Sequence, residues 1–158
     1  PFEALINGGE QEYGLRGGTS NAVVNMVFAK TLRLALENGR KYHDHIAEMR
    51  RELINGLLSI EGVEINSPLN GVVSTVNFSY EGIPSEVMQN ALNRAGFMVS
   101  ARSTCASRSD DPSYVLLAMG YSSRRASCCI RVSLTYYNTI DEVHAFVEAC
   151  REMIRNYG

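Results

Sequence analysis

The sequence predicts an α+β fold in which a small, mainly antiparallel sheet is packed by helices on one face. Two observations support this prediction. Short segments rich in valine, threonine and phenylalanine are interspersed with segments whose apolar residues recur every three or four positions. The two kinds of segment also follow one another in mixed order, with the expected succession helix, strand, strand, helix, strand, helix, strand, helix.

The composition is that of an ordinary globular protein. Apolar residues make up 45% and charged residues 20% of the 158 positions. The net charge of −2 lacks the basic excess expected of a nucleic-acid-binding protein. No apolar run reaches the roughly 20 residues of a membrane span, and no charged and then apolar leader opens the chain. We therefore expect a cytoplasmic protein that binds neither nucleic acid nor membrane.

The first part of the chain is expected to contain a loop and a long helix. Residues 1–21 are rich in glycine and show almost no apolar periodicity, which is typical of a loop. Residues 22–61 show helical spacing of apolar side chains and predict one long helix or a helix pair. Asn38 and Gly39 mark the expected bend or break.

Residues 62–158 are expected to form the α+β domain. Strands are predicted in four segments, which are residues 63–66, 72–80, 97–100 and 129–134. Helices are predicted in three segments, which are residues 84–95, 112–119 and 140–154. Thr139 followed by Glu142 has the pattern of a capping box and marks the start of the last helix.

The last predicted strand directs one arginine away from the core. Alternation puts Ile130, Val132 and Leu134 on the core face, so Arg131 projects from the other face. Arginine binds carboxylates through two parallel hydrogen bonds, which makes a carboxylate substrate one interpretation. The alternative is a surface arginine on an open sheet face.

The cysteines fit neither a disulfide framework nor a zinc site. They are Cys105, Cys128, Cys129 and Cys150. Cys105 falls in a predicted loop with Arg102 and Arg108 three residues away on either side, and cationic neighbours favour the nucleophilic thiolate. Cys105 is therefore a candidate nucleophile, the alternative being an incidental exposed thiol. The other three cysteines lie in regular elements and are predicted to be core residues.

No metal site is expected, because the three histidines, His43, His45 and His144, are spaced as solvent-exposed residues. The glycine-rich opening lacks the phosphate-loop and dinucleotide-binding motifs. Its backbone N–H groups and the hydroxyl of Thr19 nevertheless suit an anion.

Four segments of the sequence are more informative together than singly, because their order and spacing can be compared with those of known families. They are GGEQEYGLRGGT at residues 8–19, VSARSTCASRSDDPSYVLLAMG at 99–120, IRVSLTYYNT at 130–139, and the closing helix with its Asp-Glu pair at 141–142. In order and approximate spacing they resemble the C-terminal portion of the cysteine desulfurase family, which belongs to the class V aminotransferase-like enzymes that depend on pyridoxal phosphate. The resemblance implies the small C-terminal domain of a fold-type I pyridoxal-phosphate enzyme.

The resemblance implies roles for three residues. Cys105 matches the cysteine that carries the persulfide, and Arg131 matches the arginine that binds the carboxylate of the substrate, L-cysteine. Thr19 matches the threonine that reaches the cofactor phosphate of the other subunit in the homodimer. The implied products are L-alanine and a persulfide on Cys105, which is handed to a sulfur acceptor or iron–sulfur scaffold protein.

The resemblance also implies that this chain is one part of such an enzyme. The Schiff-base lysine of the family lies upstream in a segment that is absent here, and Lys30 and Lys41 match no cofactor motif. We expect residues 1–21 to belong to the missing large domain and residues 62–158 to form the small domain. Residues 22–61 are expected to form the long helix or helix pair that connects the two domains. The isolated chain is expected to be inactive.

Two alternatives remain open. A stand-alone interaction or sulfur-relay module would use this fold without a cofactor of its own. Another class V enzyme, such as a selenocysteine lyase or an aminotransferase-like enzyme, would give Cys105 a lesser role. Arg102 and Thr104 also stand where the family usually has glycine and alanine, which adds charge and stiffness beside Cys105.

Overall fold

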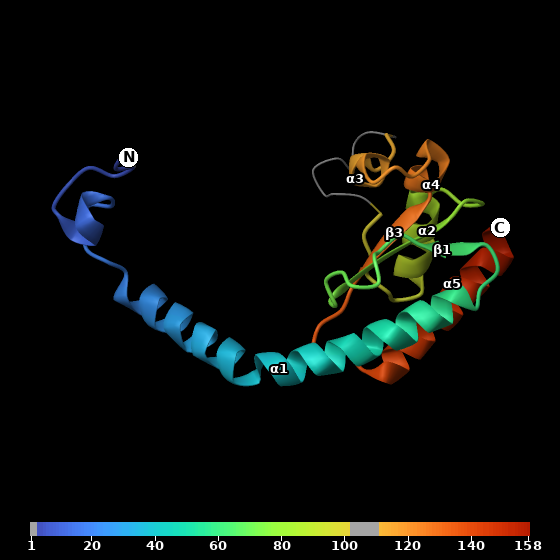
Figure 1. The fold of residues 1–158 in the computed structure, drawn as a ribbon, viewed down its shortest axis with the longest axis horizontal. Coiled ribbons are helices and arrows are strands. Elements are labelled where there is room, and N and C mark those ends of the chain that lie inside the picture. Colours follow the sequence, from blue (N-terminus) through green and yellow to red (C-terminus); the bar gives the residue numbers. More distant parts are fainter. Residues whose placement is uncertain (1–2, 102–110) are drawn as a thin grey trace. The chain divides into compact units, whose positions relative to one another are not determined.

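The computed structural model describes residues 3–101 and 111–158 of the chain. The chain divides into two compact units, Pro1–Arg40 and Lys41–Gly158. Figure 1 shows the helices and strands in the order of the sequence. Among the described residues, no helix is long and apolar enough to cross a membrane.

The first unit begins with the glycine-rich segment. This segment contains a short 3-10 helix, η1 (Gln11–Gly14), where the sequence predicts only a loop. The backbone N–H of Gly17 donates a hydrogen bond to the carbonyl oxygen of Ile6 at 2.8 Å. A Cβ atom at Gly17 would lie 2.7 Å from the Cα atom of Gly8, so glycine is required where the two stretches of backbone touch.

The long helix α1 (Ala22–Leu58) begins in the first unit and ends in the second. The side chain of Asn21 caps its start by accepting a hydrogen bond from a backbone N–H three residues on, at 3.1 Å. The structure assigns α1 as one helix through Asn38 and Gly39. At this point the Asn38 side chain donates a hydrogen bond to the carbonyl oxygen of Leu34, one turn back, at 2.9 Å.

The second unit is built on a three-stranded antiparallel sheet in the order β1–β2–β3. The strands are β1 (Val63–Ile65), β2 (Thr75–Tyr80) and β3 (Cys129–Ser133). In the β2–β3 register, Phe78 lies opposite Ile130 and Asn77 lies opposite Arg131. The expected α+β class with a small antiparallel sheet is confirmed.

The predicted strand at residues 97–100 is wrong. Within this segment only Ser100 pairs with the sheet, through an isolated bridge to Arg131. Met98 is 84% exposed. Phe97 and Val99 pack against the main core, so burial alternates as in a strand, but only the last residue of the segment is paired with the sheet.

Four further helices belong to the described part of the second unit. They are α2 (Ser85–Arg94), α3 (Tyr114–Ala118), α4 (Ser123–Ser127) and α5 (Ile140–Tyr157). Helix α4 is not predicted from the sequence, because its five residues are mostly polar and show no helical periodicity. The helix is capped by the Ser122 hydroxyl, which accepts a hydrogen bond from the Arg125 N–H at 3.1 Å.

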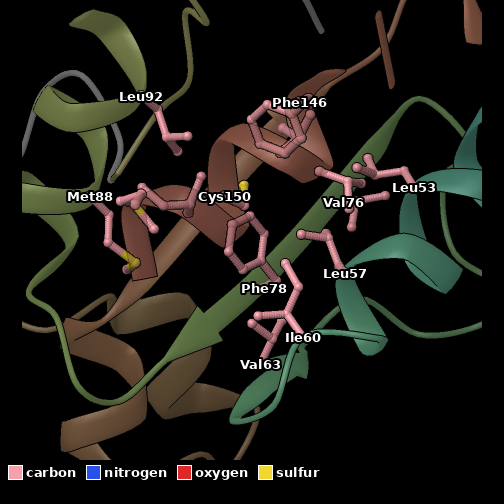
Figure 2. Close-up of a cluster of buried hydrophobic side chains, with 14 of the residues drawn as sticks. Leu53, Leu57, Ile60, Val63, Val76, Phe78, Met88, Leu92, Phe146 and Cys150 are labelled. Carbon is pink, nitrogen blue, oxygen red and sulfur yellow. The ribbon is translucent and has the colours of Figure 1, made fainter. Parts of the chain in front are cut away.

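The main core lies on one face of the sheet, and Figure 2 shows side chains from three helices meeting Val76 and Phe78 of β2 there. The helical contributors include Leu53 and Leu57 of α1, Met88 and Leu92 of α2, and Phe146 and Cys150 of α5. A Cβ atom at Gly56 of α1 would lie 2.6 Å from a methyl carbon of Val147 of α5. These two helices therefore approach each other where only glycine fits.

Helices also cover part of the other face of the sheet, so the prediction that they lie on one face is wrong. Leu116 of α3 and Ala126 of α4 form a small buried cluster with Cys129 of β3. The adjacent Cys128 belongs to the main core. The two cysteines thus point to opposite faces, as alternation along an extended chain predicts.

Leu57→Ala tests the main core. Leu57 is fully buried, and we expect its truncation to lower the free energy of unfolding by about 2–5 kcal/mol. Leu69→Ala makes the same chemical change at a side chain that is 90% exposed. This control is expected to shift the free energy of unfolding by less than about 0.5 kcal/mol. Urea unfolding followed by circular dichroism measures both, and equal losses would contradict this placement of the core.

The predicted capping box at the start of α5 is confirmed. The Thr139 hydroxyl accepts a hydrogen bond from the Glu142 N–H at 3.2 Å, and the Glu142 carboxylate accepts one from the Thr139 N–H at 2.9 Å. The hydrogen bond from the Thr139 backbone, followed by one from the Asn138 side chain, lowers the pKa of Glu142 from its ordinary value.

This lowered pKa makes α5 sensitive to acid. The carboxylate stabilises the fold above its unfolded-state pKa, and the contribution is lost as the pH falls through the lower folded-state pKa. We therefore expect Glu142→Gln to lose less stability than the unmodified chain between about pH 6 and about pH 3. Glu152→Gln, an exposed position on the same helix, should follow the unmodified chain. Thermal unfolding across this range measures the profiles, and identical profiles for all three would contradict the prediction.

Candidate functional site

A pocket of about 500 Å³ opens on the sheet face opposite the main core. Side chains of β2 and β3 meet residues of α3 and its flanks there. Its polar lining residues are Asn66, Ser67, Asn77, Asp111, Ser113 and Arg131. Its apolar lining includes Ala101, Pro112, Leu116 and Met119.

Asn77 and Arg131 are direct neighbours in this pocket. They lie opposite each other in the β2–β3 register. The backbone N–H and C=O of Arg131 instead bond to Ser100 on its other side, at 2.7 and 3.1 Å. Asn77 and Arg131 therefore form a pair without hydrogen bonds between their backbones, in which Cα atoms typically lie about 4.5 Å apart. Their side chains leave the same face of the sheet side by side.

Arg131 projects from the sheet as the sequence predicts. It is exposed between the buried residues Ile130 and Val132. Within residues 3–101 and 111–158, its guanidinium has no hydrogen-bond or ion-pair partner. The acidic residue in the pocket wall, Asp111, does not form an ion pair with it. Arg131 thus presents to the pocket a fork of N–H donors that no described residue occupies.

A chain of polar side chains stands behind the pocket. Arg125 donates from Nε to Oδ1 of Asn66 at 2.6 Å, and Asn66 donates from Nδ2 to Oδ1 of Asn77 at 2.7 Å. The Asn66 side chain is buried and also donates to the hydroxyl of Ser79 at 2.7 Å. Glu64 contacts the Arg125 guanidinium at 3.0 Å. These contacts connect β1 and β2 to α4.

This chain of polar side chains is not predicted from the sequence. Its signal is the pair of polar residues Asn77 and Ser79, which occupy alternate positions of a strand whose other face is apolar. Such residues are exposed on an open sheet, or they face a site when the sheet is covered. The partners Asn66 and Arg125 are 59 positions apart in the sequence, so no local pattern connects them.

The candidate nucleophile Cys105 lies outside the described residues. The same is true of its neighbours Arg102, Thr104 and Arg108. The described residues on either side of this segment, Ala101 and Asp111, both line the pocket that contains Arg131. Cys105 follows Ala101 by four residues in the sequence, and four residues of extended chain cover at most about 14 Å.

The other three cysteines are buried, which confirms the prediction that they are core residues. Burial raises the pKa of the Cys150 thiol to about 12. Burial also raises the pKa of Cys128, and the neighbouring Glu81 carboxylate adds to this shift. Neutral thiols in such surroundings are poor nucleophiles.

Thr19 lies in the first unit and is exposed. The Arg16 side chain donates hydrogen bonds to the carbonyl oxygens of Gly18 and Thr19 at 3.3 and 3.2 Å. The Thr19 hydroxyl makes no hydrogen bond to the part of the chain that the structure describes. A hydroxyl donor beside an arginine suits the oxygens of a phosphate group.

The described residues do not form a complete pyridoxal-phosphate site. Both lysines, Lys30 and Lys41, are exposed side chains on α1. A lysine that holds this cofactor needs a cavity that encloses the ring, and an exposed helix surface does not provide one. The chain supplies residues that suit a substrate carboxylate and a phosphate group, and no step through the cofactor follows from them.

The histidines differ partly from expectation. His45 is half-buried, and its Nε2 lies 2.9 Å from the carbonyl oxygen of Asn138, so its predicted full exposure is wrong. His43 and His144 are exposed beside Asp44 and Glu52, respectively. Among the described residues, no three His, Cys, Asp or Glu side chains gather to hold a metal ion.

Comparison with known proteins identifies the family. The model of the class V aminotransferases matches residues 6–146, so the chain belongs to this family. A cysteine desulfurase of Sinorhizobium fredii is 37% identical over 145 residues, which are 90% of this chain and 38% of the relative. The cysteine desulfurase IscS of Clostridium botulinum is 34% identical over 158 residues, covering 98% of this chain and 40% of the relative. The resemblance to cysteine desulfurases is thereby confirmed.

Solved structures agree with these relatives. A NifS-like protein superposes with a TM-score of 0.83 at 33% identity, over 99% of this chain and 40% of the other. A NifS-like protein from Rickettsia africae superposes with a TM-score of 0.79 at 25% identity, over 97% of this chain and 40% of the other. The chain spans about 40% of the length of the relatives that it matches.

Thiol labelling tests the contrast among the cysteines. We expect limiting iodoacetamide near neutral pH to modify Cys105 first, because burial keeps Cys150 and Cys128 protonated and inaccessible. Peptide mass spectrometry locates the label. Cys105→Ser should remove the rapid phase, and urea should make the three remaining thiols reactive. Faster labelling of Cys128 or Cys150 in the native chain would contradict the prediction.

Proposed function

We propose that this chain is part of a pyridoxal-phosphate-dependent cysteine desulfurase and carries its sulfur-accepting thiol on Cys105. The observation that supports this most strongly is the pocket beside Arg131. Its wall contains a guanidinium that has no partner among the described residues, and the two described residues that flank the Cys105 segment, Ala101 and Asp111. A carboxylate-binding group and the two described ends of the segment that carries the candidate nucleophile therefore line one pocket.

Arg131 would bind the carboxylate of L-cysteine. Its fork of N–H groups matches the two oxygens of a carboxylate, and its neighbours on β3 are buried, so its strand is well anchored. Hydrogen bonds between charged groups are typically worth about 1.5–3 kcal/mol. Because Arg131 would hold only the carboxylate, the thiol of the substrate would remain free to react.

Cys105 would act as the nucleophile towards the sulfur of the substrate. Its thiolate sulfur forms a bond to the substrate sulfur as the carbon–sulfur bond breaks. The carbon takes the electron pair of the broken bond and gains the proton that the substrate thiol gives up, so it becomes the methyl group of L-alanine and the persulfide is left as its anion. Pyridoxal phosphate supplies the electron sink for this chemistry when it is bound.

The remaining expectations belong to the same proposal. Residues 1–21 would belong to a large cofactor-binding domain, and residues 62–158 would form the small domain. Residues 22–61 would connect these two domains. Thr19 would reach the cofactor phosphate of the other subunit in a homodimer. The enzyme would act in the cytoplasm and pass its sulfur to an acceptor, such as an iron–sulfur scaffold protein.

Substitutions in an enzyme that contains this chain test the two roles. We expect Cys105→Ser to abolish alanine formation from cysteine and leave the cofactor absorbance unchanged, because the thiol attacks sulfur and does not hold the cofactor. Arg131→Lys keeps the charge but loses the fork and should raise KM for cysteine about tenfold or more. Arg155→Lys, at an exposed position on α5, is the matched control and should leave KM unchanged.

The alternatives give different results. Full activity of the Cys105→Ser enzyme would favour another class V enzyme, such as a selenocysteine lyase or an aminotransferase-like enzyme. A sulfur-relay module would instead gain sulfur on Cys105 from a separate active desulfurase, which mass spectrometry of the isolated chain detects. The reading frame upstream of this chain separates these cases directly, because a lysine-bearing cofactor domain there would support the desulfurase.

A further inference from the structure

The polar chain behind the pocket has a defined direction. The Arg125 guanidinium has only N–H donors, so the atom of Asn66 that it contacts at 2.6 Å must be the amide oxygen. The Asn66 NH2 group then points the other way, to the side chain of Asn77 at 2.7 Å. Because this group can only donate, the Asn77 atom that receives it must be Oδ1.

This direction leaves the Asn77 NH2 group turned away from Asn66. Asn77 lines the pocket, and its Nδ2 has no hydrogen-bond partner in the described part of the chain. The neighbour across the strand pair is Arg131. Two sets of N–H donors therefore stand side by side on one wall of the pocket.

We propose that Asn77 is a second donor to the substrate carboxylate beside Arg131, held in this orientation by Arg125 and Asn66. The proposal rests on the proposed function and adds a specificity-determining residue to it. A carboxylate has two oxygens with about four acceptor positions, so it accepts from a guanidinium and an amide together. A neutral amide end offers only one acceptor oxygen and no charge to pair with the guanidinium, so it would satisfy these donors less completely.

The backbone of Asn77 has a separate, structural role. Its N–H donates to the Ser67 hydroxyl at 2.8 Å, and its carbonyl oxygen accepts from the Asn66 N–H at 2.8 Å. These contacts remain when only the side chain is changed. A substitution of the Asn77 side chain therefore tests the donor role with the main-chain contacts of β2 kept.

Nuclear magnetic resonance of the full 158-residue chain provides the test. The chain is labelled with nitrogen-15 and titrated with sodium acetate, against sodium chloride at equal ionic strength. The signals followed are the Asn77 side-chain NH2 and the Arg131 Nε–H. We expect both to shift with acetate and with one common dissociation constant. We expect Asn77→Ala to weaken acetate binding at Arg131 by about threefold to tenfold, the effect of one lost hydrogen bond.

A second variant tests the positioning residue without changing the donor itself. Asn66→Asp keeps an acceptor for Arg125 but offers only oxygen to Asn77, whose amide must then turn its NH2 group away from the pocket. Acetate should no longer shift the Asn77 signal, and binding at Arg131 should weaken as in Asn77→Ala. Asn90→Asp adds the same charge at an exposed position of α2 and should leave both signals as in the unmodified chain.

The outcomes separate this proposal from the proposed function. If acetate shifts Arg131 but not Asn77, or if Asn77→Ala binds acetate as well as the unmodified chain, Asn77 is not a donor and the carboxylate role of Arg131 stands. If acetate shifts neither signal, the carboxylate role of Arg131 fails together with this proposal. The unchanged backbone spectrum of each variant serves as the check that it folds.

Discussion

The register between β2 and β3 is the constraint on which the second unit depends. With Phe78 opposite Ile130, one face of the strand pair is apolar and meets α1, α2 and α5. The same register puts Asn77 beside Arg131 on the opposite face. A slip by one residue would move the apolar set into the pocket and the arginine into the core. Burial of the core face therefore also determines which side chains the pocket contains.

Features with a strong local signal were predictable. The capping box at Thr139 follows from two residues three positions apart, and the orientation of Arg131 follows from strict alternation along β3. The failed predictions lack such a signal or have a misleading one. The polar helix α4 has no periodicity, and the apolar run at residues 97–100 resembles a strand although only Ser100 pairs with the sheet. Residues 97–100 form no strand because the segment meets β3 at a single residue, and this tertiary contact cannot be read from the local sequence.

The pocket was predictable only in part, for a physical reason. Arg131 stands out because an arginine within an apolar strand has to leave the core. Asn66 and Arg125 become a positioning pair only through tertiary contact, since a buried amide needs partners and the fold supplies them from distant parts of the chain. The family resemblance assigned expected roles to Cys105, Arg131 and Thr19. It did not name the residues that orient a neighbour through hydrogen bonds.

The close approach of α1 and α5 at Gly56 also limits how the sequence can change over evolution. A side chain at position 56 would overlap Val147, and both helices are held by the same core, so neither can withdraw alone. A larger residue at 56 is therefore acceptable only with a smaller one at 147. The two positions form a size-compensating pair, and relatives that share this packing should carry a side chain at 56 only where the residue at 147 is smaller than valine.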